Sequence, residues 1–355
     1  MNEQTDSPAT EPGPRHALWR WIVRGLLALV ALIAVTVAAA LTYQAIATAH
    51  DARQFPPPGK LVDIGGYHLH INTTGEGGPT VILDAGLGDC SINWCLVQPE
   101  VAKFARVCSY DRAGTGWSEP SPFPRTNRQI VQELHTLLTN AGIPGPYVLV
   151  GHSFGGLNVR LFAHEYPQEV AGLVLVDSSH EDQFARMPES MLKMMYDHLP
   201  ELKSRRIWSR LGILRLFYPP TNRRLPVAMQ AVDRSCRLRT TYWEACYGES
   251  ITFEDCVTQF REAKTLPQVP LVVLTAGDMG NNPPPTISAE DFARWKALWV
   301  ECQNELASRC ADSTHITVEK SSHLIPLDQP AAVVAAIREV VEKARQRAAA
   351  LAAAK

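Results

Sequence analysis

The segment YVLVGHSFGG, residues 147–156, places one serine, Ser153, between two glycines at the end of an apolar run. This order predicts a buried strand, a sharp turn and a helix, with the Ser153 hydroxyl clear of the backbone and Gly151 and Gly155 keeping the turn compact. A serine so placed can act as a nucleophile, and the amide of Phe154 would point toward the oxyanion formed there. The alternative is a glycine-rich turn with an incidental serine.

A serine is a weak nucleophile unless a base takes its proton and an acid orients that base. Behind a nucleophile of this kind, we expect both partners on later loops that follow strands, the acid before the histidine. His323 follows the predicted strand ITVEKSS and is the candidate base, whereas His315 stands at the opposite end of that strand. Asp278 follows PLVVLTAG and is the candidate acid, with Asp177, at the end of AGLVLVD, in reserve.

Two further loops follow apolar runs. The glycines of DAGLGDC, residues 84–90, would let a backbone amide approach a substrate, and we expect the Leu87 amide to be the second oxyanion-hole donor. A plain glycine turn is the alternative. Asp111, in YDRAGTGWS, is expected to hold a turn by accepting hydrogen bonds from nearby backbone amides.

The elements around these residues alternate between strands and helices, which predicts a parallel sheet covered on both faces. A hairpin is expected in LVDIGGYHLHINTTGEGG, and a helix with Thr126 as N-cap is expected to end at Gly142. Strands are predicted at 80–86, 105–111, 147–153, 171–177, 270–278 and 316–323, and further helices at 154–166, 289–307 and from 331. Residues 178–267 contain no convincing strand and predict a mostly helical cap over the carboxyl edge of the sheet.

The N-terminal part differs from the rest. Residues 1–17 are polar and predict a disordered tail, and residues 18–47 are long and apolar enough to cross a bilayer. Arginines precede the apolar run, so the positive-inside rule predicts a cytoplasmic N-terminus and a main domain outside the cytoplasm. A Pro-rich linker is expected at 48–59. The alternative is a signal peptide cleaved after Ala49, which would give a secreted or periplasmic protein.

The composition argues against nucleic-acid binding and against a zinc site. Lys and Arg number 34 and Asp and Glu 36, so the near-neutral chain gives no basic footprint for nucleic acid. The eight cysteines permit disulfides outside the cytoplasm, and Cys302 with Cys310 is a plausible local pair. Their spacing does not favour zinc, and no metal, organic cofactor or specific protein partner is predicted.

Taken together, DAGLG, YDRAGTGWS, GHSFGG, the strand ending at Asp278 and SSH at 321–323 resemble the serine α/β-hydrolase superfamily. The resemblance spans about residues 60–345 and is nearest to the capped esterase, lactonase and proline-iminopeptidase-like group. It implies a mostly parallel eight-stranded sheet with helices on both faces and a lid after the sixth strand. The implied core is 60–177 and 268–345, the cap 178–267, the Ala-rich tail 346–355, and the triad Ser153, Asp278 and His323.

One departure concerns Ala85-Gly86, where many members of the superfamily have His-Gly. Ser153 argues against the haloalkane dehalogenases and epoxide hydrolases of this fold, which use an aspartate nucleophile.

We therefore expect hydrolysis of a small or hydrophobic carboxylic ester through an acyl-enzyme. A peptidase or amidase would also need an acidic cap site for a substrate amine, for which Glu181, Asp182 and Glu189 are available. A non-catalytic binding protein is the third possibility.

The cap supplies the candidates for substrate contacts. Acyl-pocket candidates are Met187, Met191, Met194, Met195, Trp208, Phe217, Tyr218 and Trp243, with core packing as the alternative for each. Arg205, Arg206, Arg210 and Arg215 could meet an anionic substrate or lipid headgroup, or could form a solvated helix face.

Overall fold

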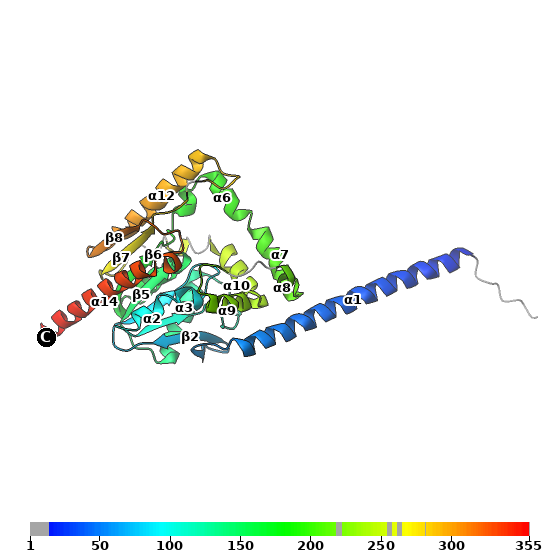
Figure 1. Cartoon of the computed structure of the whole chain (residues 1–355), viewed down its shortest axis with the longest axis horizontal. Helices are drawn as coiled ribbons and strands as arrows, with labels where there is room; N and C mark the ends of the chain where they lie inside the picture. Colours follow the sequence, from blue (N-terminus) through cyan, green and yellow to red (C-terminus); the bar gives the residue numbers. More distant parts are fainter. Residues whose placement is uncertain (1–13, 218–221, 254–257, 261–264, 281, 355) are drawn as a thin grey trace, which may run out of the picture.

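A computed structural model describes residues 14–217, 222–253, 258–260, 265–280 and 282–354. Residues 1–13 of the predicted disordered tail, the pocket candidate Tyr218 and Cys256 lie outside these ranges. Residues 14–17, predicted as part of the tail, are helical instead. An eight-stranded sheet with the order β1-β2-β4-β3-β5-β6-β7-β8 forms the centre of the molecule (Figure 1). Its strands are β1 (Lys60–Asp63), β2 (His68–Thr74), β3 (Thr80–Asp84), β4 (Val107–Tyr110), β5 (Tyr147–His152), β6 (Val170–Val176), β7 (Leu271–Ala276) and β8 (Ser313–Val318).

The sheet is antiparallel only where β1 pairs with β2 and β2 with β4, and the first of these pairs is the predicted hairpin. The other pairs are parallel, so the carboxyl ends of β3 to β8 meet at one edge. The central strands read as unbroken apolar runs because helices cover both of their faces.

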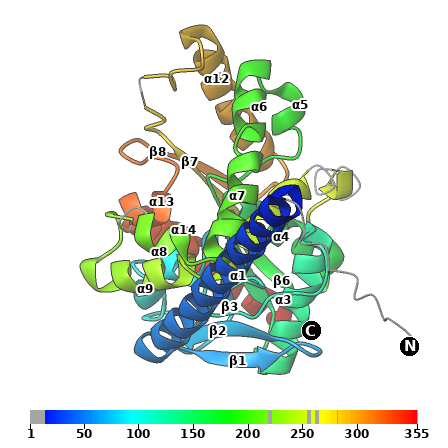
Figure 2. The same ribbon diagram turned by 90° about the vertical axis from the view of Figure 1, so that its right-hand side faces the viewer.

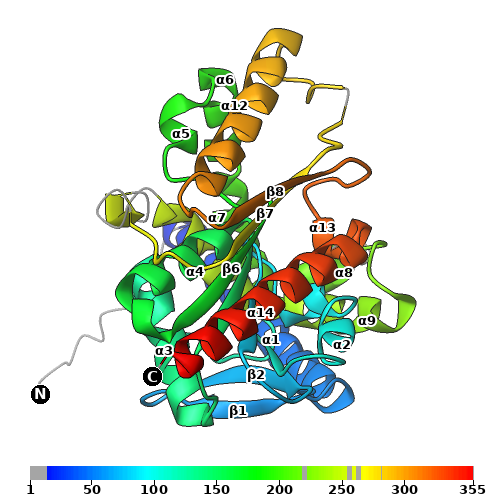
Figure 3. The same ribbon diagram turned by 90° about the vertical axis from the view of Figure 1, so that its left-hand side faces the viewer.

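The two faces have separate cores. In β5, Leu149 packs in the cluster with α3 (Asn127–Ala141) and α4 (Phe154–Glu165), whereas Val148 and Val150 pack in the cluster with α2 (Gln98–Val101) and α14 (Pro330–Ala353). Figure 3 shows α14 running along its face of the sheet, with α12 (Ala289–Ala307) beside β8. This alternation is the two-residue period of a strand buried on both sides.

Local signals placed most elements correctly. The Thr126 side chain caps α3 by accepting from the Gln129 amide, and Gly142 ends the helix in the left-handed conformation with φ 67°. The strand before His323 was predicted with wrong bounds: β8 spans 313–318 instead of 316–323, because Ser313 already pairs with Leu271 of β7. This edge strand is polar and partly exposed at its start, so it lacks the apolar pattern of the central strands.

The segment between β6 and β7 will be called the insertion. Its described elements are all helices: α5 (Gln183–Arg186), α6 (Glu189–Tyr196), α7 (Leu199–Arg210), α8 (Ile213–Phe217), α9 (Val227–Arg237) and α10 (Thr240–Ile251), with 258–260 also helical. They lie at the carboxyl end of the parallel strands (Figure 1). The short 3-10 helices η1 (Ser91–Trp94) and η2 (Pro167–Glu169) and the helix α13 (Ile325–Asp328) complete the fold.

The N-terminal helix α1 (Pro14–Gln54) is longer than expected. Residues 48–54, predicted as linker, continue the helix, and the Pro-rich stretch begins only after it. From Leu18 onward, α1 is long and apolar enough to cross a membrane, a test that a signal sequence near the N-terminus also passes. It extends away from the rest of the molecule (Figure 1).

All seven described cysteines are free, so the expected Cys302–Cys310 disulfide is not formed. Cys302 lies inside α12, which continues to Ala307 before the chain reaches Cys310. The five helical residues after Cys302 carry the chain about 7.5 Å along the helix axis to Ala307 before it can turn back toward Cys302.

Candidate active site

Ser153 lies on the strained turn between β5 and α4, with φ 53° and ψ −118°. The flanking glycines are required by packing. A Cβ on Gly155 would lie 2.4 Å from the carbonyl oxygen of Asp84, and one on Gly151 would lie 2.5 Å from that of Gly155. A non-glycine residue held at positive φ costs about 1–3 kcal/mol and is typical of active sites.

His323 is paired with a carboxylate. Its Nδ1 donates to Oδ2 of Asp177 over 2.6 Å. The other oxygen, Oδ1, accepts from the Ala276 amide at 2.9 Å and from Nε1 of Trp299 at 2.8 Å. Three donors therefore fix a carboxylate that is buried, and the carboxylate in turn fixes the imidazole with its proton on Nδ1.

This pairing corrects the expectation for Asp278, because the structure brings Asp177 to His323 instead. Asp177 follows directly on β6 with φ 44°, so the chain turns at that residue. Asp278 lies two residues beyond the end of β7, where its Oδ1 accepts from the Gly280 amide at 3.1 Å. Asp278 still lines the same cavity as Ser153 and His323, but as part of a turn.

His152 supports His323 from the other side. Its Nε2 lies 2.8 Å from the carbonyl oxygen of His323, and since a carbonyl only accepts, the His152 proton is on Nε2. Burial, together with the nearby His323 ring, lowers the pKa of His152 from 6.5 to about 4. His152 therefore stays neutral near pH 7 and acts as a fixed hydrogen-bond donor.

The two amides expected to face an oxyanion belong to residues that line the cavity, Leu87 and Phe154. Within the described part of the chain, neither amide donates a hydrogen bond to the protein. Two such amides at the carboxyl edge of β3 and the N-terminus of α4 are available to a ligand oxygen.

Arg112, which sequence reasoning missed, holds the loop that carries Leu87. Its Nη1 and Nη2 donate to the carbonyl oxygens of Ala85 and Gly86, both at 2.7 Å, and Nε donates to Oε1 of Glu249 in α10. Burial opposes its charge, but the Glu249 and Asp84 carboxylates raise its pKa well above the ordinary value. Arg112 thus links the loop to the insertion, a role that its place after Asp111 in the sequence did not indicate.

Asp111 holds a turn, as predicted. Its carboxylate accepts from the amides of Ser91 and Trp117 at 2.7 and 2.9 Å, and from Nδ1 of His70 at 2.8 Å.

A cavity of about 1070 Å³ opens above Ser153. Of the predicted pocket residues that the structure describes, Met187 and Met195 line it and Met194 does not. Met191 and Trp243 are buried elsewhere, and Trp208 and Phe217 are exposed. The remaining walls are mainly apolar and aromatic: Phe184, Tyr196, Leu199, Leu202, Phe253, Met279, Phe292, Trp295 and Trp299 among others. The α12 aromatics could not be predicted as cavity residues, because they have the spacing of an ordinary packed helix.

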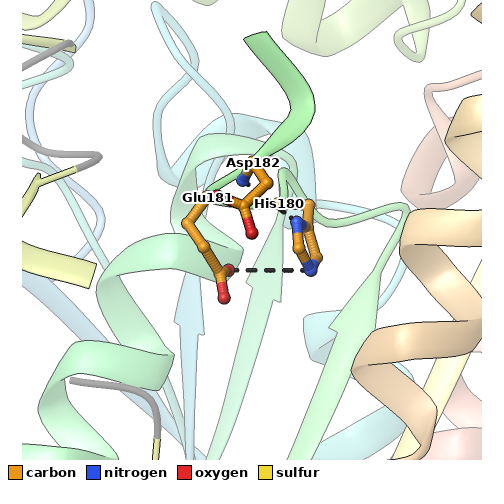
Figure 4. A group of neighbouring side chains, drawn as sticks. All are labelled: His180, Glu181 and Asp182. Carbon is orange, nitrogen blue, oxygen red and sulfur yellow. Dashed lines mark hydrogen bonds and ion pairs between the residues drawn. The ribbon is translucent and has the colours of Figure 1, made fainter. Parts of the chain in front are cut away.

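Three side chains after β6 lie close enough together to hold a metal ion: His180, Glu181 and Asp182 (Figure 4). The negative charge of Glu181 is, however, already balanced by two arginines. Its Oε2 accepts from Nη1 of Arg160 at 2.8 Å, and its Oε1 accepts from Arg309. Burial works against the charge, but these arginines lower the pKa of Glu181 below its ordinary value. The arrangement is that of a structural ion-pair network.

The four arginines that were candidates for binding an anionic substrate also have protein partners. Arg205 pairs with Glu201, Arg206 and Arg210 pair with Glu244, and Arg215 contacts α1. None of the four lines the cavity.

Comparisons with known proteins bear on this arrangement. Residues 81–336 match the model of the alpha/beta hydrolase family. The chain belongs to that family. The uncharacterised protein YqjL of Bacillus subtilis is 27% identical over 296 residues, which are 82% of this chain and 95% of that protein. The probable transporter efuK of Hormonema carpetanum is 33% identical over 136 residues, 36% of this chain but only 20% of that protein.

Solved structures agree on the fold of this alpha/beta hydrolase. A thermophilic esterase from Thermogutta terrifontis superposes with a TM-score of 0.57 at 22% identity, over 80% of this chain and 98% of that one. Likeness at this identity shows the fold, and the reaction has to be argued from the site.

Proposed function

We propose that this alpha/beta hydrolase cleaves carboxylic esters with a large apolar part, through an acyl-enzyme on Ser153. The observation that carries the proposal is the 2.6 Å hydrogen bond from His323 to Asp177 at the wall of the cavity that also contains Ser153. A serine on a strained turn, an oriented histidine and two available amides are the parts that acyl transfer needs.

In the proposed reaction, Oγ of Ser153 attacks the carbonyl carbon of the ester while Nε2 of His323 takes the hydroxyl proton. The amides of Leu87 and Phe154 stabilise the oxyanion, and Asp177 stabilises the imidazolium. When the intermediate collapses, the alcohol leaves with the proton from His323. Water then attacks the acyl-enzyme with His323 again as base, which releases the acid and restores Ser153.

The walls of the cavity support the choice of substrate class. Its volume is at or above the upper end of ordinary small-molecule sites, about 300–1000 Å³. Aromatic and aliphatic side chains form most of its lining. Each buried methylene of a ligand contributes about 0.8 kcal/mol, so long acyl chains should be favoured over acetate.

The amidase alternative has less support. It needs an unpaired carboxylate to hold a substrate amine, but Glu181 is paired with Arg160 and Arg309. Neither Glu181, Asp182 nor Glu189 lines the cavity.

The test is hydrolysis of p-nitrophenyl esters with acyl chains of two to twelve carbons by the full-length protein in detergent. We expect kcat/KM to rise by up to about fourfold per methylene and then to level off. Ser153→Ala should abolish turnover of every ester, while Ser178→Ala, a change at a buried serine that does not line the cavity, serves as the matched control. Turnover that survives in Ser153→Ala would reject the mechanism, and a preference for acetate would reject the substrate class.

A further inference from the structure

One residue near the C-terminal end of α1 is buried although its neighbours in the sequence are exposed. Tyr43 is 49% exposed, like the apolar residues before it, but Gln44 is only 5% exposed. Nε2 of Gln44 donates to the carbonyl oxygen of Leu238 at 2.9 Å, and its Oε1 accepts from Nε of Arg215 at 2.8 Å. Both polar atoms of the buried Gln44 amide are hydrogen-bonded to residues of the insertion, so α1 makes a specific contact there.

Arg215 extends this contact along the next two turns of α1. Its Nη2 donates to Oγ1 of Thr48 at 3.1 Å, and its Nη1 donates to Oδ2 of Asp51 at 2.7 Å. These partners lie on both sides of Ala49. Cleavage there would leave Asp51 as the remaining partner of a largely buried guanidinium. The N–H groups that donate to Gln44 and Thr48 would lose their acceptors, which is destabilising for buried donors.

The length of the apolar run places the bilayer relative to this contact. Residues 25–44 form about 30 Å of helix at 1.5 Å per residue, which matches the hydrocarbon core, so the lipid ends near Tyr43. Gly212 packs against that residue, since a Cβ on Gly212 would lie 2.9 Å from Cδ1 of Tyr43. The next residues form α8, which therefore lies at the level of the bilayer surface.

The exposed side chains of α7 and α8 fit such a surface. Leu216 and Phe217 are 70% and 77% exposed, and Ile207 and Trp208 of α7 are exposed beside them. Figure 1 shows that α7 and α8 reach farthest along the direction in which α1 leaves the domain, and Figure 2, viewed from that side, shows them next to α1. Tryptophan is enriched at membrane interfaces, and helices that lie in the interface carry Trp, Phe and Leu on the face that enters the lipid.

We propose that α1 is retained as a membrane anchor docked on the insertion through Arg215, and that this contact seats Ile207, Trp208, Leu216 and Phe217 in the surface of the lipid bilayer. The partner is the lipid surface itself, and the proposal is independent of the reaction at Ser153. Because α7 also lines the cavity with Leu199 and Leu202, the helix that contacts the lipid also forms part of the wall of the substrate site.

The test uses the full-length protein in phosphatidylcholine nanodiscs, with a nitroxide attached to Phe217→Cys or, as the matched control, to Ile316→Cys. Ile316 is also exposed but lies on β8, away from α1. At Phe217 we expect collisions with oxygen, which is enriched in lipid, to exceed those with a water-soluble nickel complex, and the reverse at Ile316. Equal access of the nickel complex to both sites would overturn the proposal.

Two further measurements test the docking. The mass of the membrane-extracted protein should include the residues before Ala49, and a chain starting at His50 would overturn retention. Arg215→Gln should move the Phe217 label into water while the protein stays in the nanodisc, whereas Arg210→Gln, which removes only the pair with Glu244, should not. Gln44→Leu should repeat the effect of Arg215→Gln, and unchanged lipid exposure in both variants would overturn the docking role.

Discussion

Asp177 and Asp278 occupy corresponding places in this molecule, yet only one contacts the histidine. Each follows a buried parallel strand, and β6 and β7 are neighbours in the sheet. Asp177 is buried and hydrogen-bonded to His323, whereas Asp278 accepts from the amide of Gly280 in its own turn. The comparison shows that a strand end supplies the place for an acid, while the backbone angle after the strand decides whether its side chain reaches the base.

The surroundings of the two carboxylates reinforce the difference. Asp177 receives the Ala276 amide and Trp299 Nε1 in addition to His323. The backbone amide of Asp278 is bonded to Ser321, which ties its turn to the segment that carries His323 without bringing the carboxylate there. Both residues line the same cavity as the histidine, but only Asp177 is hydrogen-bonded to it.

The largest effect is expected from Asp177→Asn. An amide at this position cannot hold the His323 tautomer, so kcat on the best ester should fall about 10³–10⁴-fold with little change in KM. Steady-state kinetics with matched Asp278→Asn protein provides the measurement. If Asp278→Asn suffered the large loss and Asp177→Asn did not, the assignment of the two acids would be reversed.

A smaller effect, on the free energy of unfolding, is expected from His152, which donates to the backbone carbonyl of His323. Its pKa is about 4 in the folded protein against 6.5 ordinarily, so the unfolded chain binds more protons between these values. The resulting stability is fully present above pH 6.5 and is lost as the pH falls toward 4, by about 3 kcal/mol. Urea unfolding between pH 7 and 4 should show this loss, and His152→Gln should reduce it by that amount. An equal pH dependence in both proteins would contradict the lowered pKa.

Trp299→Phe should have a still smaller effect, because it removes one of three donors to Asp177 and keeps most of the ring. A lost hydrogen bond to a charged group is worth about 1.5–3 kcal/mol, so kcat should fall roughly 10- to 100-fold. Trp295→Phe, a neighbouring change in the cavity wall, is the control for altered substrate contacts. Equal losses of kcat in the two variants would assign Trp299 to substrate binding instead.

The smallest effect is expected from Asp278→Asn, for which kcat should stay within about twofold of the wild type, since an asparagine side-chain oxygen can also accept from the Gly280 amide. The double variant Asp177→Asn/Asp278→Asn sharpens the comparison. Its kcat should equal that of Asp177→Asn alone. A further drop in the double variant would show that Asp278 partly replaces the missing acid.

The sequence predicted the sheet, α3 and the turn at Ser153 because their signals are local: apolar runs, a cap at Thr126 and glycines at fixed offsets. His323, which the sequence places after a strand for the same reason, lines the cavity that contains Ser153. The choice between Asp177 and Asp278 depends on a backbone angle of 44° that no residue pattern encodes. Arg112 bonds Gly86 and Glu249, which lie 26 and 137 residues away in the sequence, and a local pattern cannot reveal such contacts.

The contact between the N-terminal helix and the insertion could have been predicted from one residue of the sequence. Gln44 is a polar side chain inside an otherwise apolar stretch, and such a residue in a helix calls for a hydrogen-bonding partner. The aromatic side chains of α12, in contrast, could not be told from core residues, because a helix that lines a cavity and one that packs against a core have the same periodicity.

The turn at Asp278 bears on how related enzymes diverge in sequence. Its carboxylate serves its own loop, and that loop forms part of the cavity wall between β7 and α12. The loop after β7 takes no part in the proposed proton transfer. It can therefore gain, lose or exchange residues while turnover continues. In relatives that keep an aspartate at the end of β6, we expect substrate preference to diverge first in the loop after β7.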